Sequence, residues 1–212
     1  MTPWQKSGET QSPPDKIDLR PQPVLPSRVA PRLLLQAAME MGLDRFEPFD
    51  IMINKEHDIL NDEVFHSLLK ICWSGIVGLI TLAPPCKEYS RLKLRPGGPP
   101  ALRTPEHMQG VPWNNKYQQQ QVTESKAIHE RGRALFQAVA RKGGVAIHEQ
   151  PPSSMAWLEP ENFATLQEVH GHITWVAACA YGVNLPKSWP CSCNHQEHQT
   201  SGQRMQLPGG TP

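Results

Sequence analysis

Two short segments of the sequence carry a chemically reactive side chain directly after an apolar run. Cys86 ends the stretch IVGLITLAPPC, residues 76–86, and Glu149 ends the stretch VAIHE, residues 145–149. A cysteine thiolate is a strong nucleophile, and a basic neighbour such as Lys87 favours it. A protonated Glu149 would donate to a ring nitrogen of a substrate. Both positions are equally compatible with a structural role, because free cysteine is commonly buried and a glutamate at a strand end can reach solvent.

The elements expected around these residues alternate between helix and strand. The predicted order is helix 32–43, strand 49–54, helix 61–75, strand 76–85, helix 117–144, strand 145–152, helix 161–172 and strand 173–182. This alternation predicts an α/β domain with a mostly parallel sheet and right-handed crossovers. Ligands of such sheets bind at the carboxyl ends of the strands, so Asn54, Cys86 and Glu149 are expected to converge on one edge.

The composition of the chain divides it into three parts. Prolines are about twice as frequent as usual, with 22 in 212 residues, and many lie in residues 1–31. That segment is predicted to be a disordered Pro-rich stretch, followed by one α/β domain over residues 32–190. Residues 191–212 are predicted to be a flexible tail that contains cysteine and histidine.

Charge and cysteine usage limit the function classes. The net charge of +1 gives no global reason for a polyanionic partner, so a nucleic-acid site would be a local basic patch. Five cysteines in a chain of this length form no secreted disulfide framework. The first residues have no apolar signal segment, and no apolar run is long enough to span a bilayer. An intracellular protein, nuclear or cytoplasmic and without a membrane partner, is therefore expected.

The segments APPCKEYS, residues 83–90, and HEQPP, residues 148–152, resemble two motifs of the DNA cytosine-C5 methyltransferase family. The likeness is greatest to its divergent phage- and retroelement-type relatives and covers about residues 49–190. Segments 95–112 and 179–189 resemble the same group. The resemblance implies a Rossmann-like methyltransferase fold in which Cys86 adds to C6 of a cytosine. It also implies that Glu149 hydrogen-bonds N3 and the exocyclic amine of that base.

The resemblance implies a cofactor and a partner as well. The cofactor would be S-adenosylmethionine, with Asp58 of HDIL, Asp50, Pro84 and Pro85 as candidate contacts. The partner would be DNA, either single-stranded or with the target cytosine flipped out of the duplex. The candidate DNA contacts are Ser90, Arg91, Lys93, Arg95, Arg103 and Lys187.

The sequence also departs from the family. It has no Phe-x-Gly-x-Gly turn to wrap the methionine part of the cofactor, and Gln150 stands where the family motif has asparagine. The cofactor pocket is therefore expected to be incomplete, and the chain alone is expected to show weak or no activity. The alternative is a non-catalytic nucleic-acid-binding or interaction remnant on the same fold.

Two further interpretations rest on histidines. A cysteine hydrolase would use Cys86 with His107, His129 or His148 as its base, although no oxyanion-type glycine turn follows the cysteine. The tail also brings together four side chains able to bind metal, namely Cys191, Cys193, His195 and His198. Their spacing is tight for one tetrahedral zinc ion and matches no standard zinc finger, so a flexible tail without metal is the competing interpretation.

Overall fold

The computed structural model describes residues 39–40, 42, 46, 48–177 and 188–194. The chain divides into two compact units between His57 and Asp58. In the first unit Met39 and Glu40 are helical, and the rest of the predicted helix 32–43 lies outside the described residues or in a turn at Gly42.

The prediction of a strand over residues 49–54 is wrong. The chain turns there, with the amides of Ile53 and Asn54 donating to the Asp50 carbonyl oxygen. The Asp50 carboxylate also accepts from the Met52 amide at 2.8 Å. An aspartate that hydrogen-bonds its own backbone two residues on stabilises a turn in place of a strand.

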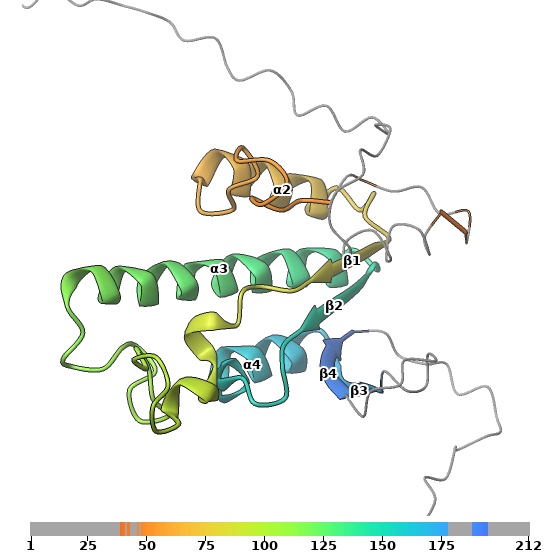
Figure 1. Cartoon of the computed structure of the whole chain (residues 1–212). Helices are drawn as coiled ribbons and strands as arrows, with labels where there is room; N and C mark the ends of the chain where they lie inside the picture. Colours follow the sequence, from red (N-terminus) through yellow and green to blue (C-terminus); the bar gives the residue numbers. More distant parts are fainter. Residues whose placement is uncertain (1–38, 41, 43–45, 47, 178–187, 195–212) are drawn as a thin grey trace, which may run out of the picture. The chain divides into compact units, whose positions relative to one another are not determined.

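The second unit contains the helices and strands that concern the site (Figure 1). In chain order they are α2 (Asp62–Trp73), β1 (Leu79–Leu82), η1 (Lys87–Tyr89), η2 (Arg91–Leu94), α3 (Lys116–Arg141), β2 (Val145–Glu149), η3 (Met155–Leu158), α4 (Pro160–Glu168), β3 (His172–Ala177) and β4 (Ser188–Cys193). The predicted α/β class is confirmed, and each of the six ranges predicted after residue 60 contains or overlaps a helix or strand of the expected kind. Residues 178–182 of the last predicted strand lie outside the described residues. Within the described residues, no helix has the length and apolar character needed to cross a membrane.

The strands form one mixed sheet in the order β1-β2-β4-β3. β1 and β2 are parallel, and β4 is antiparallel to both β2 and β3. Three strands therefore run in one direction and β4 opposes them, so the prediction of a mostly parallel sheet holds only in part. Residues 178–187 connect β3 to β4, and this is fewer than the dozen or so residues that a parallel crossover needs.

The sequence did not predict β4, which continues past residue 190 into the segment expected to be a flexible tail. Pro190 argues against a central strand because proline cannot donate to a neighbouring strand. In the structure Pro190 faces only Trp175 of β3, since the pairing with β2 begins at Cys191.

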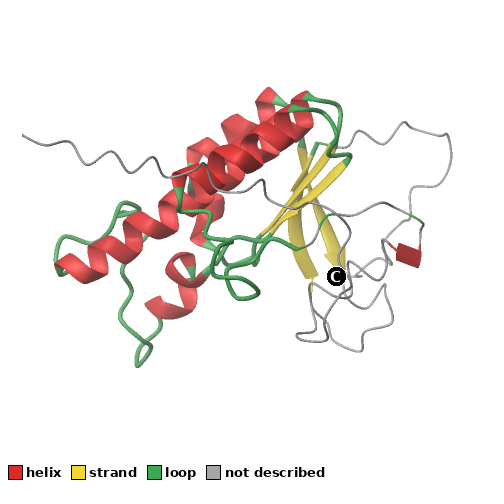
Figure 2. Cartoon of the chain, turned by 90° about the horizontal axis from the view of Figure 1, so that it is seen from above, coloured by secondary structure: helices red, strands yellow, loops and turns green. Residues whose placement is uncertain are grey.

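The helices α2, α3 and α4 of the second unit lie together on one side of the sheet (Figure 2). α3 packs on β1 and β2, while α2 and α4 pack on α3. The shared core consists of Cys72, Val77, Leu135, Phe136, Ala138, Val139, Ala146 and Leu166. Since side chains of a strand alternate between faces, Ala146 and His148 of β2 point toward the helices and are buried. Glu149 belongs to the opposite face.

Asparagine caps begin the two long helices. The Asn61 side chain accepts from the Glu63 and Val64 amides, as the sequence predicts for the start of α2. Asn115 and Gln118 form a reciprocal capping box at the start of α3. α3 thus starts at a fixed point, which matters because it carries several residues of the site.

Candidate functional site

Cys86 lies just beyond β1, where the chain leaves the sheet. It is the residue before η1, and its carbonyl oxygen accepts from the Tyr89 amide at 3.0 Å. Its side chain is partly exposed, whereas Cys72 and Cys191 are buried. A thiol in this position is accessible to a ligand at the carboxyl end of the parallel strand pair.

The two sequence motifs leave the sheet side by side. Leu82 at the end of β1 is opposite His148 of β2. Two residues further along each chain segment, the side-chain nitrogen Nε2 of Gln150 donates to the Pro84 carbonyl oxygen at 2.6 Å. The Gln150 oxygen accepts from the Ser154 hydroxyl at 3.0 Å, and the Gln150 side chain is almost fully buried. Gln150 therefore ties the segment before Cys86 to the segment after Glu149.

Glu149 is the last residue of β2 and is half-buried. It is opposite Cys191 of β4, whose pKa is raised by burial and then by the nearby Glu149 charge. Asn54, the third residue expected at this edge, lies in the first unit within the turn that replaces the predicted strand. Because residues 49–54 form no strand, Asn54 does not stand at the carboxyl end of one.

A buried polar network lies next to the Cys86 segment. The Tyr89 hydroxyl donates to Glu159 at 2.5 Å, and Arg133 donates to the other oxygen of this carboxylate at 2.9 Å. Burial and this hydrogen bond raise the pKa of Tyr89. The guanidinium of Arg103 lies 4.1 Å from the centre of the Tyr89 ring and 3.8 Å from Glu159. The network fixes η1, and hence the residues that follow Cys86, against α3 and α4.

Arg103 is not available for a phosphate, contrary to the sequence-based prediction. It is fully buried and donates to the carbonyl oxygens of Met108 and Val122. A single arginine supplies five donors in a rigid fork, so Arg103 holds together the loop before α3. Lys93 is also engaged, since it is largely buried and donates to Glu88 at 2.6 Å.

The remaining candidate DNA contacts differ in their accessibility. Arg91 and Arg95 are exposed. The Ser90 hydroxyl accepts from the Leu92 amide as the cap of η2, and Ser90 pairs with Ser154 in an isolated bridge. Lys187 lies outside the described residues.

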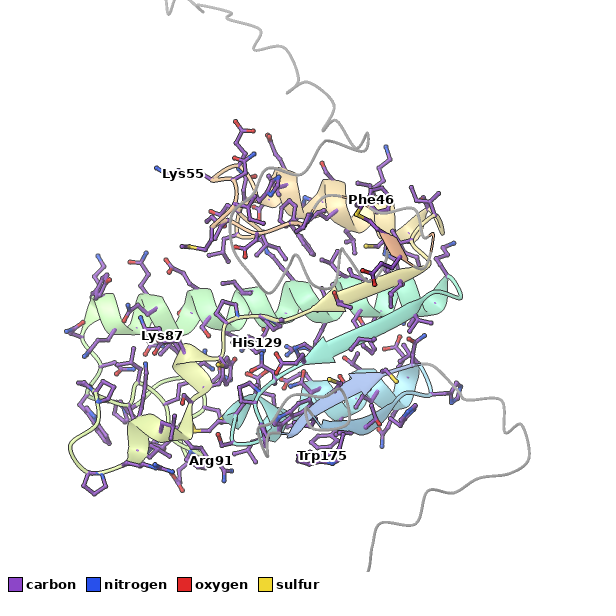
Figure 3. The ribbon with its side chains drawn as sticks, turned by 45° about the vertical axis from the view of Figure 1, so that its right-hand side comes forward. Phe46, Lys55, Lys87, Arg91, His129 and Trp175 are labelled. Carbon is purple, nitrogen blue, oxygen red and sulfur yellow. The ribbon has the colours of Figure 1, made fainter. Side chains whose placement is uncertain are left out.

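Two histidines, His129 and His148, are buried, and Figure 3 labels the first of them. His129 of α3 has its Nε2 atom 3.5 Å from the Pro85 carbonyl oxygen and its ring 4.4 Å from that of Tyr89. The His148 ring lies 6.0 Å from the His129 ring. Burial lowers the pKa of His129 to about 4 and that of His148 to about 3. Both rings are therefore neutral at pH 7, and the positive charge near Cys86 must come from other residues.

The candidate cofactor contacts include two aspartates, each engaged in its own turn. The Asp50 and Asp58 carboxylates accept from the amides of Met52 and Leu60 in their own turns, and they belong to different units. The described structure has a cavity of about 10 Å³ beside His148 and a groove of about 340 Å³ between α3 and α4. Neither is lined by Asp50, Asp58, Pro84 or Pro85. Neither hollow therefore offers these candidate residues a shared site for S-adenosylmethionine.

Of the four candidate metal ligands, the structure describes the two cysteines. Cys191 and Cys193 lie in β4, and the Cys193 sulfur is 3.5 Å from Nε2 of His172 on β3. His195 and His198 lie outside the described residues. Within the part of the chain that the structure describes, no three histidine, cysteine or acidic side chains form a group able to hold a metal ion.

Sequence reasoning did not assign a role to Gln150, Tyr89 or Glu159, which hold the site together. For Gln150 one signal was present in the sequence, namely its position in the HEQPP motif. Its hydrogen-bond partners could not be predicted, because Pro84 is 66 residues away in the chain and Ser154 lies in the following loop. Comparison with known proteins adds no assignment: no family model, no curated protein and no solved structure matches this chain.

Proposed function

We propose that the second unit is a DNA cytosine-C5 methyltransferase-like domain, with Cys86 as its nucleophile and Glu149 as the residue that binds the base. The observation that carries the proposal is the hydrogen bond from Gln150 to the Pro84 carbonyl oxygen. It joins the APPC segment to the HEQPP segment at the carboxyl ends of two parallel strands. A ligand of an α/β sheet binds at such an edge.

The sheet supports the same proposal at the level of fold. β1, β2 and β3 run in one direction, and the antiparallel β4 is inserted between β2 and β3. We propose that these four strands correspond to the second half of a Rossmann-like methyltransferase sheet. A fold by itself does not imply a function, so the catalytic part of the proposal rests on Cys86 and Glu149.

The chemistry begins with the addition of Cys86 to the pyrimidine. The thiolate sulfur forms a bond to C6 of cytosine, and the C5–C6 π electrons move to C5, which becomes nucleophilic. Glu149 hydrogen-bonds N3 and the exocyclic amine and offsets the negative charge that develops on the ring. The target base must be outside a duplex for this contact, either flipped or in a single strand.

S-adenosylmethionine, when bound, would supply the methyl group. Because the sequence lacks the Phe-x-Gly-x-Gly turn and the candidate contacts line neither hollow described above, the proposal includes weak or absent methylation by this chain alone. Isothermal calorimetry tests this part separately. Micromolar binding of S-adenosylmethionine by the purified chain would contradict it.

Covalent trapping tests the nucleophile. A single-stranded oligonucleotide with 5-fluorocytosine is incubated with the protein and the methyl donor. The adduct becomes stable to denaturation only after methyl transfer, because fluorine cannot leave C5 as a proton does, so its expected yield is low and in proportion to the methylation that the chain retains. Intact-mass spectrometry detects the adduct. Cys86→Ser should abolish it, whereas Cys193→Ser, at another partly exposed thiol, should not.

The outcomes separate the two leading interpretations. An adduct that persists in Cys86→Ser would show that Cys86 is not the nucleophile. No adduct with the wild-type chain, together with retained binding of the oligonucleotide, favours the non-catalytic remnant. That second interpretation is supported by the absence of a Phe-x-Gly-x-Gly turn from the sequence.

A further inference from the structure

Positive charge is concentrated between Cys86 and the first turn of α3. Residues 87–117, here called the 87–117 segment, hold six lysines and arginines and two glutamates, although the whole chain has a net charge of only +1. Lys93 is paired with Glu88, and Arg103 is buried beside Glu159. The exposed cations that remain are Lys87, Arg91, Arg95 and Lys116. Lys87 also lies near Glu88, but its side chain is 72% exposed, and such surface pairs are weak.

The same segment exposes two large aromatic side chains. Trp113 is 73% exposed and Tyr117 is 69% exposed. They flank the Asn115 cap, Trp113 in the turn before α3 and Tyr117 in its first turn. The edge of the His107 ring meets Trp113 with 6.3 Å between ring centres. Broad, solvent-facing aromatic surfaces next to cations are the features that bind unstacked bases and their phosphates.

The turn that carries Trp113 is held from several sides. The Val111 amide and the Asn114 side chain both donate to the Leu102 carbonyl oxygen at 3.0 Å. The Gln119 side chain donates to the Gln109 carbonyl oxygen at 2.8 Å. Val111 is buried, and the capping box fixes the next turn. The exposure of Trp113 is therefore a property of an ordered turn, which lowers the entropy cost of binding a ligand.

We propose that the 87–117 segment is a binding surface for single-stranded nucleic acid, with Trp113 and Tyr117 stacking on bases and the exposed cations contacting the backbone. Lys87, which Figure 3 labels together with Arg91, directly follows Cys86 in the chain, so a strand held here would lead to the proposed nucleophile. The inference rests on the proposed function and deepens it by naming where the substrate strand lies. A duplex is disfavoured because its bases are already stacked on one another and offer no free face to an aromatic side chain.

Fluorescence anisotropy with a labelled oligothymidine measures the binding. This probe contains no cytosine, and the titration needs no methyl donor. Trp113→Ala with Tyr117→Ala should weaken binding by roughly tenfold or more, because each stacked base contributes substantially. Arg91→Gln with Arg95→Gln should instead flatten the dependence of log affinity on log salt, by about 0.7 for each phosphate that no longer has a cationic partner.

Matched controls separate the surface from general effects. Trp175→Ala removes a tryptophan that is 61% exposed on β3, and it should leave the affinity unchanged. Lys142→Gln removes an exposed lysine at the other end of α3 and should not change the salt dependence. Circular dichroism should show that all variants keep the fold, since the substituted side chains are exposed.

Several outcomes would overturn the inference. The first is that the protein does not bind oligothymidine at low salt. The second is an equal affinity for a duplex of the same length, and the third is an unchanged affinity of the Trp113→Ala/Tyr117→Ala variant. The first would leave this surface to a protein partner. The proposed function is tested independently. If Cys86→Ser retains oligothymidine binding and the wild-type chain forms no adduct with 5-fluorocytosine, the catalytic part of the proposed function is rejected and the binding surface is kept.

Discussion

Gln150 is the residue on which the geometry of the candidate site depends. It stands where the resembled motif has asparagine, and its longer side chain reaches the Pro84 carbonyl oxygen and the Ser154 hydroxyl together. Both contacts are shielded from water, because the Gln150 side chain is 1% exposed. A buried carbonyl or hydroxyl that loses its partner costs more than the net value of the hydrogen bond itself.

Gln150→Leu is therefore expected to lower the free energy of unfolding by about 1–3 kcal/mol, since leucine keeps the volume and removes both hydrogen bonds. The Cys86 segment should also loosen. Urea denaturation measures the first effect, and the rate of Cys86 alkylation by iodoacetamide measures the second, with buried Cys72 as the internal reference. Gln167→Leu, at an exposed position of α4, should change neither. Equal stability of Gln150→Leu and wild type would contradict the stabilising role of the two Gln150 hydrogen bonds.

At the scale of elements, the approach of α3 to the sheet is set by a glycine. Gly144 joins α3 to β2, and a Cβ atom at this position would lie 2.5 Å from the Val77 carbonyl oxygen and 2.6 Å from a methyl carbon of Val139. Cβ atoms in proteins essentially never come within 3.0 Å of such atoms, so both contacts would be steric clashes. Gly132, in the middle of α3, differs because a Cβ there would meet no atom within 4 Å.

The two glycines should respond to alanine in opposite ways. Gly144→Ala must displace backbone and should lower the free energy of unfolding by about 1–3 kcal/mol. Gly132→Ala should raise it by about 0.5–1 kcal/mol, because alanine restricts the unfolded chain and favours the helix. Thermal and urea unfolding of the two variants measure these changes. Destabilisation by Gly132→Ala would mean that α3 is packed more tightly at this point than the structure has it.

At the scale of the whole molecule, the two buried histidines make stability depend on pH. Both have a pKa below the usual 6.5 in the folded state, chiefly because burial disfavours the charged ring. The positive charges of Arg133 and Arg103 add to this effect at His129. When pH falls below about 6.5, the unfolded chain takes up protons that the folded chain does not, and the unfolded state is favoured.

The free energy of unfolding should therefore be constant with respect to these groups above pH 7. It should decrease as pH falls from about 6.5 toward 4 for His129, and toward 3 for His148. Urea titrations at several pH values measure the slope. His148→Gln should make the slope shallower between pH 6 and 4, whereas His66→Gln, at an exposed position on α2, should leave it unchanged. A wild-type slope in His148→Gln would contradict the assignment.

The elements found from the sequence were those with local signals. Asn61 predicted the start of α2, and apolar runs that end in prolines predicted β1 and β2. Residues 49–54 misled because their apolar pattern suits a strand, while the Asp50 side chain stabilises a turn. Arg103 was wrongly predicted to contact DNA, because a basic residue in a Gly/Pro-rich loop suggests exposure. In the structure it is buried and donates to the carbonyl oxygens of Met108 and Val122.

The sequence by itself determined the α/β class and the two strand ends that carry Cys86 and Glu149, because hydrophobic periodicity and helix caps act over a few residues. The tertiary structure alone decided the strand order, with β4 between β2 and β3, and which residues meet at the site. The Gln150–Pro84 contact joins residues 66 positions apart, and the Tyr89–Glu159 contact joins residues 70 apart. Such contacts depend on how the chain closes on itself, and no local pattern encodes them.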